Sequence, residues 1–347
     1  MMKAVKKFSE GGVHFSLVEA PEPMVEQDDD VKIRIDSIGV CTSDIHVLHG
    51  TMDMPDGNIV GHEFSGRIVD LGLSASKRLS VGDRVVCELA KGSCMRCRVC
   101  RSGHYELCPE KQPPGWKSQG IYAEYTVQPE YCIHRIPDDL PMNVAAMAEP
   151  MAITVYGCLE RGKVEPGDFT VIYGMGSIGL FTLIALLDYG VQQIVCVTST
   201  RKNRSRFDLA GELGATKVLS SESDIEREIV AMNSGWKADC VIDCSGAPTA
   251  INQGIGLVKK GGKFIALGIA GDTLIPFPFN QAVLNVIEMI FSATSSHDSW
   301  KKAIGILERN PDKVKKVITH EYHLEKWQNA FQSMESREAV KAVLTVK

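Results

Sequence analysis

The sequence predicts an α/β protein of two domains, a mainly β domain and a doubly wound parallel sheet. The chain of 347 residues is longer than one hydrophobic core usually supports. Short β-branched runs broken by Gly, Pro and Asp dominate residues 1–150, and apolar strands alternate with helical stretches from residue 151 onward. The change of pattern near residue 150 is therefore the expected domain boundary.

The first region should form strands with few helices between them. Residues 31–40, 64–72 and 82–89 read VKIRIDSIGV, FSGRIVDLG and GDRVVCEL. Each run is rich in β-branched residues and lies beside glycine or aspartate, which favour turns. The last run of the chain, AVKAVLTVK, is also typical of a strand and could rejoin this domain.

The second region repeats the order strand, helix, strand. The expected strands are residues 169–174, 192–199, 239–246 and 263–270, and the expected helices include 177–190 and 204–215. Such alternation is typical of β-α-β units on a parallel sheet. The segment SSHDSWKKAIGILERNPDKV, residues 295–314, should then be helical. With no obvious flexible linker, we expect the two domains to form a ligand-binding cleft.

Four clustered cysteines predict a closed structural zinc site in the first region. They are Cys94, Cys97, Cys100 and Cys108. Four thiolates around Zn²⁺ leave no open coordination position, so such a site stabilises the fold without doing chemistry. Two disulfides are the alternative, but cysteines this closely spaced are awkward to pair with one another.

Composition limits the partners of the protein. The formal net charge is −5, which disfavours binding to nucleic acid or anionic lipid, so we expect a small-molecule partner. No apolar run is long enough for a signal peptide or a membrane span. The eleven cysteines, an odd number, suit a reducing compartment. We therefore expect a cytoplasmic protein without disulfides and without membrane contact.

A glycine motif predicts a nicotinamide dinucleotide site. Gly174, Gly176 and Gly179 follow a predicted strand and open a helix whose first residues are Ser177 and Ile178. In this context the glycines permit a tight turn, close approach of a pyrophosphate and packing of helix on strand. Amides at the helix N-terminus meet the negative charge. We therefore expect a Rossmann domain.

The second strand favours NADP over NAD. An NAD site usually has an acidic residue about twenty positions after the glycines, where this chain has Ser199. Thr200, Arg201 and Arg204 follow, and their hydroxyl and guanidinium groups suit a 2′-phosphate. NAD stays possible, because exposed arginines at a helix start are often only solvated.

Three kinds of residue predict a second, catalytic zinc site. Cys41 precedes His62 and Glu63, and Glu149 lies just before the change of domain. Cysteine, histidine and carboxylate are the ligands of an open zinc site that water or substrate completes. Each residue alone could instead be an ordinary buried or surface group.

These motifs together resemble the zinc-dependent medium-chain alcohol dehydrogenase family, in its sorbitol (polyol) and threonine dehydrogenase branch. The resemblance covers essentially the whole chain. It is carried, in order, by CTSDIH at 41–46, GHEFSG at 61–66, GDRV at 82–85, the four cysteines, Glu149 with Pro150, and the glycine motif.

The resemblance implies a GroES-like catalytic domain, a distorted barrel, from residues 1–150 and 291–347, and a Rossmann domain from residues 151–290. It implies two zinc ions per chain, with Cys41, His62 and Glu63 as ligands of the catalytic one. Glu149 would be an exchanging or neighbouring acid. Ser43 and His46 match the family positions that relay a proton to solvent.

The implied activity is transfer of a hydride between a secondary alcohol, expected to be a polyol with its ketose partner, and NAD(P). L-threonine 3-dehydrogenase is the alternative, and a non-catalytic zinc- and NADP-binding protein is a third reading. The segment IFSATSSHDSW lacks the arginine common in polyol enzymes. Relatives of this family imply a homo-oligomer, either a tetramer or a dimer.

Overall fold

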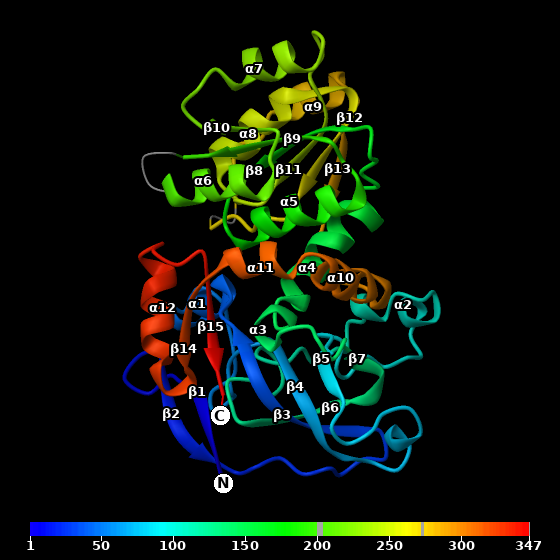
Figure 1. Ribbon diagram of the computed structural model, residues 1–347, viewed down its shortest axis with the longest axis vertical. Coiled ribbons are helices and arrows are strands. Elements are labelled where there is room, and N and C mark those ends of the chain that lie inside the picture. Colours follow the sequence, from blue (N-terminus) through cyan, green and yellow to red (C-terminus); the bar gives the residue numbers. More distant parts are fainter. Residues whose placement is uncertain (200–203, 272–273, 347) are drawn as a thin grey trace. The chain divides into compact units, whose positions relative to one another are not determined.

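The computed structural model describes residues 1–199, 204–271 and 274–346. The chain divides into two compact units (Figure 1). Unit 1 comprises Met1–Glu149 and Ser295–Lys347, and unit 2 comprises Pro150–Thr294. Helix α4 (Ala148–Val155) carries the chain from the first unit into the second. Within the described ranges, no helix is long and apolar enough to cross a membrane.

Unit 1 is built on a seven-stranded sheet with the order β14-β15-β3-β4-β5-β7, in which β6 also pairs with β3. Strands β1 and β2 form a separate antiparallel pair. The strands are β1 (Met2–Phe8), β2 (His14–Ala20), β3 (Asp30–Gly39), β4 (Glu63–Leu71), β5 (Arg84–Cys87), β6 (Tyr125–Pro129), β7 (Ile133–Arg135), β14 (Ile318–His323) and β15 (Lys341–Thr345).

The helices of unit 1 are mostly short and lie in the connections. They are α1 (Thr42–Leu48), η1 (Ala75–Lys77), α2 (Arg98–Arg101), η2 (Tyr105–Leu107), η3 (Glu130–Cys132), α3 (Met142–Ala145), α10 (His297–Arg309), α11 (Pro311–Val317), η5 (Leu324–Lys326) and α12 (Trp327–Glu335). The predicted scarcity of helices before residue 150 is thus confirmed, as are the helices expected after residue 295.

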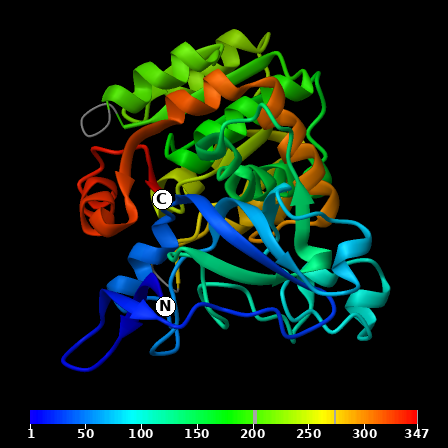
Figure 2. The ribbon, with the colours of Figure 1, turned by 60° about the horizontal axis from the view of Figure 1, so that its bottom comes forward.

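Strand β3 organises the core of unit 1. Val31, Ile33 and Ile35 alternate along it and are fully buried, as one-sided packing of an antiparallel strand requires. The last strand, β15, pairs antiparallel with the other end of β3, where Leu344 faces Ile38. The C-terminal run therefore returns to unit 1, as the sequence predicts; it is the red strand beside the blue one in Figure 2.

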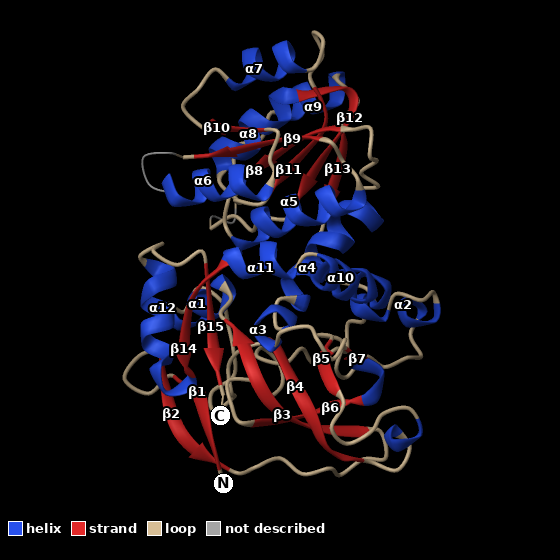
Figure 3. Ribbon diagram, in the orientation of Figure 1, coloured by secondary structure: helices blue, strands red, loops and turns tan. Residues whose placement is uncertain are grey.

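Unit 2 is a parallel sheet of six strands with the order β10-β9-β8-β11-β12-β13. Helices cover both faces of this sheet (Figure 3). Its elements are η4 (Tyr156–Arg161), β8 (Phe169–Tyr173), α5 (Ser177–Tyr189), β9 (Gln193–Thr198), α6 (Arg204–Leu213), β10 (Lys217–Ser220), α7 (Ile225–Met232), β11 (Ala238–Asp243), α8 (Pro248–Leu257), β12 (Val258–Ala266), α9 (Phe279–Leu284) and β13 (Glu288–Phe291).

This strand order confirms the predicted doubly wound fold. The chain runs outward from β8 to β10 and then returns to β11, which lies on the other side of β8. Dinucleotides bind such sheets at the carboxyl ends of the strands where the order reverses. The glycine motif directly follows β8 and therefore stands at this point.

Candidate active site

Three metal-type ligands meet at the start of strand β4. The ligand atoms of Cys41, His62 and Glu63 all lie within 4.8 Å of one another. Cys41 is the N-cap residue of α1, directly after β3, and Glu63 begins β4. Because Gly39 and Glu63 are opposite one another in the β3–β4 ladder, the two strands bring these ligands together.

Asp44 holds the ring of His62. His62 Nδ1 lies 3.4 Å from Asp44 Oδ1, and both side chains are buried. Tyr122 Oη donates a hydrogen bond to Asp44 Oδ2 at 2.9 Å. The ring of Trp116 stacks on the imidazole with 4.2 Å between centroids. A histidine that binds metal usually has such a carboxylate partner, which fixes the orientation of its ring.

Glu63 pairs with a buried lysine, Lys341, which was not among the predicted site residues. Lys341 Nζ lies 2.8 Å from Glu63 Oε1 and 2.6 Å from Oε2, and it also donates to the carbonyl oxygen of Val40 at 2.9 Å. A Cβ at Gly39 would lie 2.1 Å from Glu63 Oε2, so only glycine leaves room for this carboxylate. A lone lysine in the apolar run AVKAVLTV was the available signal, since buried lysines need partners.

Negative charge is concentrated around these ligands. Burial favours the neutral forms of His62 and Lys341, yet anionic neighbours outweigh it and raise both pKa values. Asp44 and Cys41 raise the pKa of His62, and Glu63 and Cys41 raise that of Lys341. A buried site with this charge suits a divalent cation, and Cys, His and Glu are ligands that Zn²⁺ accepts.

Glu149 is a buried neighbour of the three ligands. It lies at the start of α4 and is 6% exposed. Burial raises the pKa of Glu149 to about 7; Glu63 adds to this shift and His62 opposes it. Its carboxylate is not among the ligand atoms that lie within 4.8 Å of one another.

Ser43 and His46 lie on helix α1, which begins beside the metal ligands. The Ser43 hydroxyl is buried and has no hydrogen-bond partner in the described part of the chain. His46 is exposed, and its Nδ1 lies 3.2 Å from Thr51 Oγ1. The helix thus carries one buried hydroxyl and one solvent-facing imidazole.

The four clustered cysteines also converge. Cys94 Sγ lies 4.0 Å from Cys100 Sγ and 3.6 Å from Cys108 Sγ. Tetrahedral Zn²⁺ with bonds of about 2.3 Å places sulfur atoms about 3.8 Å apart, so this spacing fits zinc. The backbone N–H of Cys94 lowers the pKa of Cys108 to about 7, which favours a thiolate. All eleven cysteines are free thiols.

The glycine motif has the geometry of a phosphate-binding turn. Gly174 has a φ of +89°, and Gly176 is the N-cap residue of α5, which begins with Ser177 and Ile178. A Cβ at Gly179 would lie 1.8 Å from the carbonyl oxygen of Gly174, so helix and strand pack too closely for a side chain. Space is open beside Gly176.

Arg206 borders that open space. A Cβ at Gly176 would meet only the Arg206 guanidinium, whose Nη1 is 3.9 Å away. This arginine was not among the predicted site residues, although it belongs to the same run as Arg204. Arg204 itself is exposed and pairs with Asp208 at 3.1 Å. Ser199 follows β9, whereas Thr200 and Arg201 lie outside the described residues.

Comparison with known proteins agrees with this fold. Residues 27–138 match the model of the alcohol dehydrogenase GroES-like domain, and residues 141–346 match that of the glucose dehydrogenase C-terminus. A sorbitol dehydrogenase of Halalkalibacterium halodurans is 33% identical over 99% of both chains. A D-arabitol-phosphate dehydrogenase of Enterococcus avium is 32% identical over 99% of this chain and 97% of its own.

A solved structure shows the same architecture. It is a zinc-binding dehydrogenase of Sinorhizobium meliloti 1021 bound to NADP, with a TM-score of 0.87 at 25% identity and 99% coverage of both chains. The chain therefore belongs to the zinc-dependent medium-chain alcohol dehydrogenase family. It is an oxidoreductase of the alcohol and polyol dehydrogenase type, which uses zinc and a nicotinamide cofactor.

Proposed function

We propose that this enzyme transfers a hydride between the secondary alcohol of a polyol and NADP, at a zinc ion held by Cys41, His62 and Glu63. The mutual approach of these three ligand atoms, within 4.8 Å, carries the proposal. A zinc ion bound there would polarise the alcohol oxygen and lower its pKa. The carbinol carbon gives its hydride to the nicotinamide, the hydroxyl loses its proton, and the alcohol becomes a ketone.

Glu63 is the third protein ligand in this proposal, and Glu149 is a neighbouring acid. The carboxylate of Glu63 belongs to the convergent set, whereas that of Glu149 does not. The pKa of Glu149 is raised to about 7 chiefly by burial, whereas the carboxylate of Glu63 accepts a hydrogen bond from the Lys341 ammonium at 2.8 Å.

Ser43 and His46 provide the route for the released proton. The buried hydroxyl of Ser43 has no hydrogen-bond partner among the described residues. It can therefore accept a hydrogen bond from the substrate hydroxyl or donate one to the substrate oxygen. His46 lies one helical turn further along α1, faces solvent and has the side chain best suited to exchange protons near neutral pH.

The four-cysteine cluster holds a structural zinc ion, which gives two zinc ions per chain. Its sulfur spacing and its four thiol ligands leave no open coordination position for a substrate. It would stabilise a segment of unit 1 that contains only the short helices α2 and η2.

NADP is the preferred cofactor in this proposal. Ser199 stands where an NAD site would carry an acid, so this position lacks the carboxylate that would repel a 2′-phosphate. Arg204 and Arg206 begin the following helix and supply positive charge, with Arg206 beside the glycine turn. The NADP named for the similar Sinorhizobium meliloti structure supports the same choice.

A polyol is the proposed substrate because the two relatives described above are named for sorbitol and D-arabitol phosphate. The test is a screen of free polyols, phosphorylated polyols, L-threonine and simple secondary alcohols with each cofactor, followed by the absorbance of reduced nicotinamide. We expect the highest kcat/KM with a polyol and a lower KM for NADP than for NAD. Preference for L-threonine, or for NAD, would overturn that part of the proposal.

The apolar face of α9 and β13 supports a homo-oligomer. Strand β13 is an edge of the six-stranded sheet. Large apolar side chains are exposed along this face, namely Phe279, Val283, Leu284, Val286 and Phe291. Exposed apolar side chains beside the edge strand of a sheet often mark an interface, and a second copy would cover them by symmetry.

A further inference from the structure

Unit 1 contains another cluster of metal-type ligands, separate from the two described above. Glu88 follows strand β5, His134 lies in β7 and His297 is the first residue of α10. Their ligand atoms lie within 4.8 Å of one another. Strands β5 and β7 are paired, with Val86 opposite His134, so the sheet itself places two of these residues side by side.

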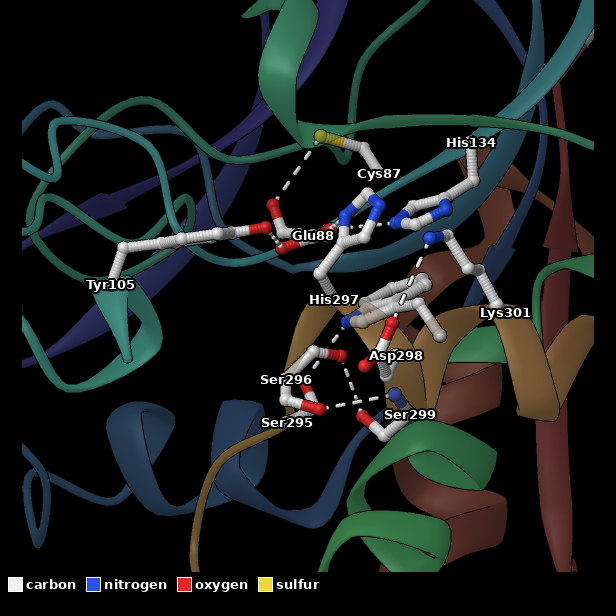
Figure 4. A network of polar contacts seen from close by, with 11 residues as sticks. Cys87, Glu88, Tyr105, His134, Ser295, Ser296, His297, Asp298, Ser299 and Lys301 are labelled. Carbon is white, nitrogen blue, oxygen red and sulfur yellow. Dashed lines mark hydrogen bonds and ion pairs between the residues drawn. The ribbon is translucent and has the colours of Figure 1, made fainter. Parts of the chain in front are cut away.

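Both imidazoles point at one carboxylate (Figure 4). His134 Nε2 lies 2.6 Å from Glu88 Oε1, and His297 Nδ1 lies 2.7 Å from the same oxygen. Ligands of a tetrahedral zinc ion with bonds of about 2.0–2.2 Å lie about 3.4 Å apart, so an ion would require only a small outward shift of these groups.

Surrounding residues hold all three side chains in place. Tyr105 Oη donates to the second oxygen of Glu88, Oε2, at 2.8 Å. The ring of Trp300 lies parallel to that of His134, with 5.8 Å between centroids and 8° between planes. Ser296 caps α10 by accepting from the backbone N–H of Ser299, which fixes the turn that bears His297. Such outer partners are characteristic of built metal sites.

The cluster is buried on one side and open on the other. The side chains of Glu88 and His134 are 1% and 6% exposed, whereas that of His297 is 37% exposed. The partly exposed imidazole of His297 thus leaves the Glu88 carboxylate at a position that an ion could reach from solvent.

We propose that Glu88, His134 and His297 form a third metal site, which binds a divalent transition-metal ion, Zn²⁺ in the first instance. Two histidines and one carboxylate are an established ligand set for such ions, with remaining positions filled by water. Each imidazole binds as its neutral tautomer, with its proton on the other ring nitrogen. Glu88 keeps its hydrogen bond from Tyr105.

The ion would fasten the start of α10 to strands β5 and β7. The chain returns to unit 1 at Ser295, two residues before His297. The other two ligands belong to the N-terminal part of unit 1, so the ion would join the two chain segments from which that unit is made. The site is therefore structural, and it does not depend on the proposed catalytic role of Cys41.

The test compares bound zinc in the wild-type enzyme with that in His297→Gln. Glutamine can still donate a hydrogen bond to Glu88, but it is a poor zinc ligand, so a purely hydrogen-bonded cluster would survive the change. Each protein is equilibrated with buffered Zn²⁺ and its zinc content is measured by mass spectrometry of the metal. His14→Gln, an exposed histidine elsewhere in unit 1, is the matched control.

We expect His297→Gln to bind one zinc ion fewer per chain than the wild type and the control. Cobalt substitution gives a second readout: the ion missing from His297→Gln should contribute visible absorption without sulfur-to-metal charge transfer, because the site has no cysteine. Equal zinc content in wild type and His297→Gln would overturn the proposal, as would loss of cysteine-derived charge transfer in the variant.

Discussion

At the scale of single residues, the proposed zinc ligands depend on partners that are not themselves ligands. His62 is oriented by Asp44, and Glu63 is paired with Lys341. Removing one member of a buried ion pair leaves an uncompensated buried charge. The free-energy cost of that charge exceeds the stabilisation that the intact pair provided. The partners should therefore matter for folding as well as for zinc binding.

In the zinc-free protein, Lys341→Met should lower the free energy of unfolding by about 3–5 kcal/mol, because Glu63 would be left buried without its ammonium partner. Denaturant titration measures this, and Lys326→Met, at an exposed position, should change it by less than about 0.5 kcal/mol. The double variant Glu63→Gln with Lys341→Met should recover part of the loss. Equal stability of Lys341→Met and Lys326→Met would show that the pair is unimportant.

Ser43→Ala should reduce kcat about a hundredfold, because the proton of the alcohol would lose its first acceptor. Zinc content and the KM for the cofactor should stay unchanged, since Ser43 is not one of the convergent ligands. Thr42→Ala, at the exposed neighbouring position of α1, is the control. Steady-state kinetics and metal analysis decide the matter, and unchanged turnover in Ser43→Ala would remove this residue from the proton route.

At the scale of elements, the close packing of α5 against β8 explains the last glycine of the motif. Gly179→Ala would place a Cβ 1.8 Å from the Gly174 carbonyl oxygen. We expect a loss of about 1–3 kcal/mol in unfolding free energy, as in other overpacked sites, and weaker cofactor binding. Equilibrium unfolding and cofactor fluorescence titration measure the two effects.

Gly167→Ala is the matched control for that change, because a Cβ at Gly167 meets nothing within 4 Å. It should leave both unfolding and cofactor binding nearly unchanged. If Gly179→Ala behaved in the same way, the close approach of helix and strand could not be the reason for glycine at this position.

The elements show how far the sequence could predict the fold. The runs around β3, β8 and β15 have a clear period and flanking turn residues, so their existence and type followed from the pattern. The sequence predicted that the last strand returns to the first domain, but it did not predict that β15 pairs with β3. The neighbours of a strand depend on tertiary contacts that no local pattern encodes.

The candidate site shows the same difference between local motifs, which the sequence reveals, and distant partners, which it does not. Ligands within short motifs, such as His62 and Glu63, were selected from spacing and residue type. Lys341 was missed because it lies 278 positions from its partner Glu63. The cluster of Glu88, His134 and His297 was missed for the same reason, since 209 positions separate Glu88 from His297. Only folding brings such residues together.

At the scale of the whole molecule, the exposed apolar face of α9 and β13 predicts self-association. Leu284 is 73% exposed on this face, so Leu284→Glu would bury a charge in any interface between copies. We expect the wild type to be an oligomer and the variant to dissociate to smaller species. Sedimentation equilibrium measures the mass of each.

Leu73→Glu changes an equally exposed leucine, 79% exposed in unit 1, and should leave the assembly intact. A monomeric wild type would contradict the proposed interface. So would a Leu284→Glu variant that assembles like the control.

The most direct test of the account is turnover of the double variant Cys41→Ala, His62→Ala, measured on protein equilibrated with zinc. We predict a folded protein that still binds the cofactor but contains one zinc ion fewer per chain, with kcat/KM lowered by about a thousandfold or more, because several kcal/mol of charge stabilisation are lost. Wild-type turnover in this variant would contradict the claim that hydride transfer takes place at this zinc ion.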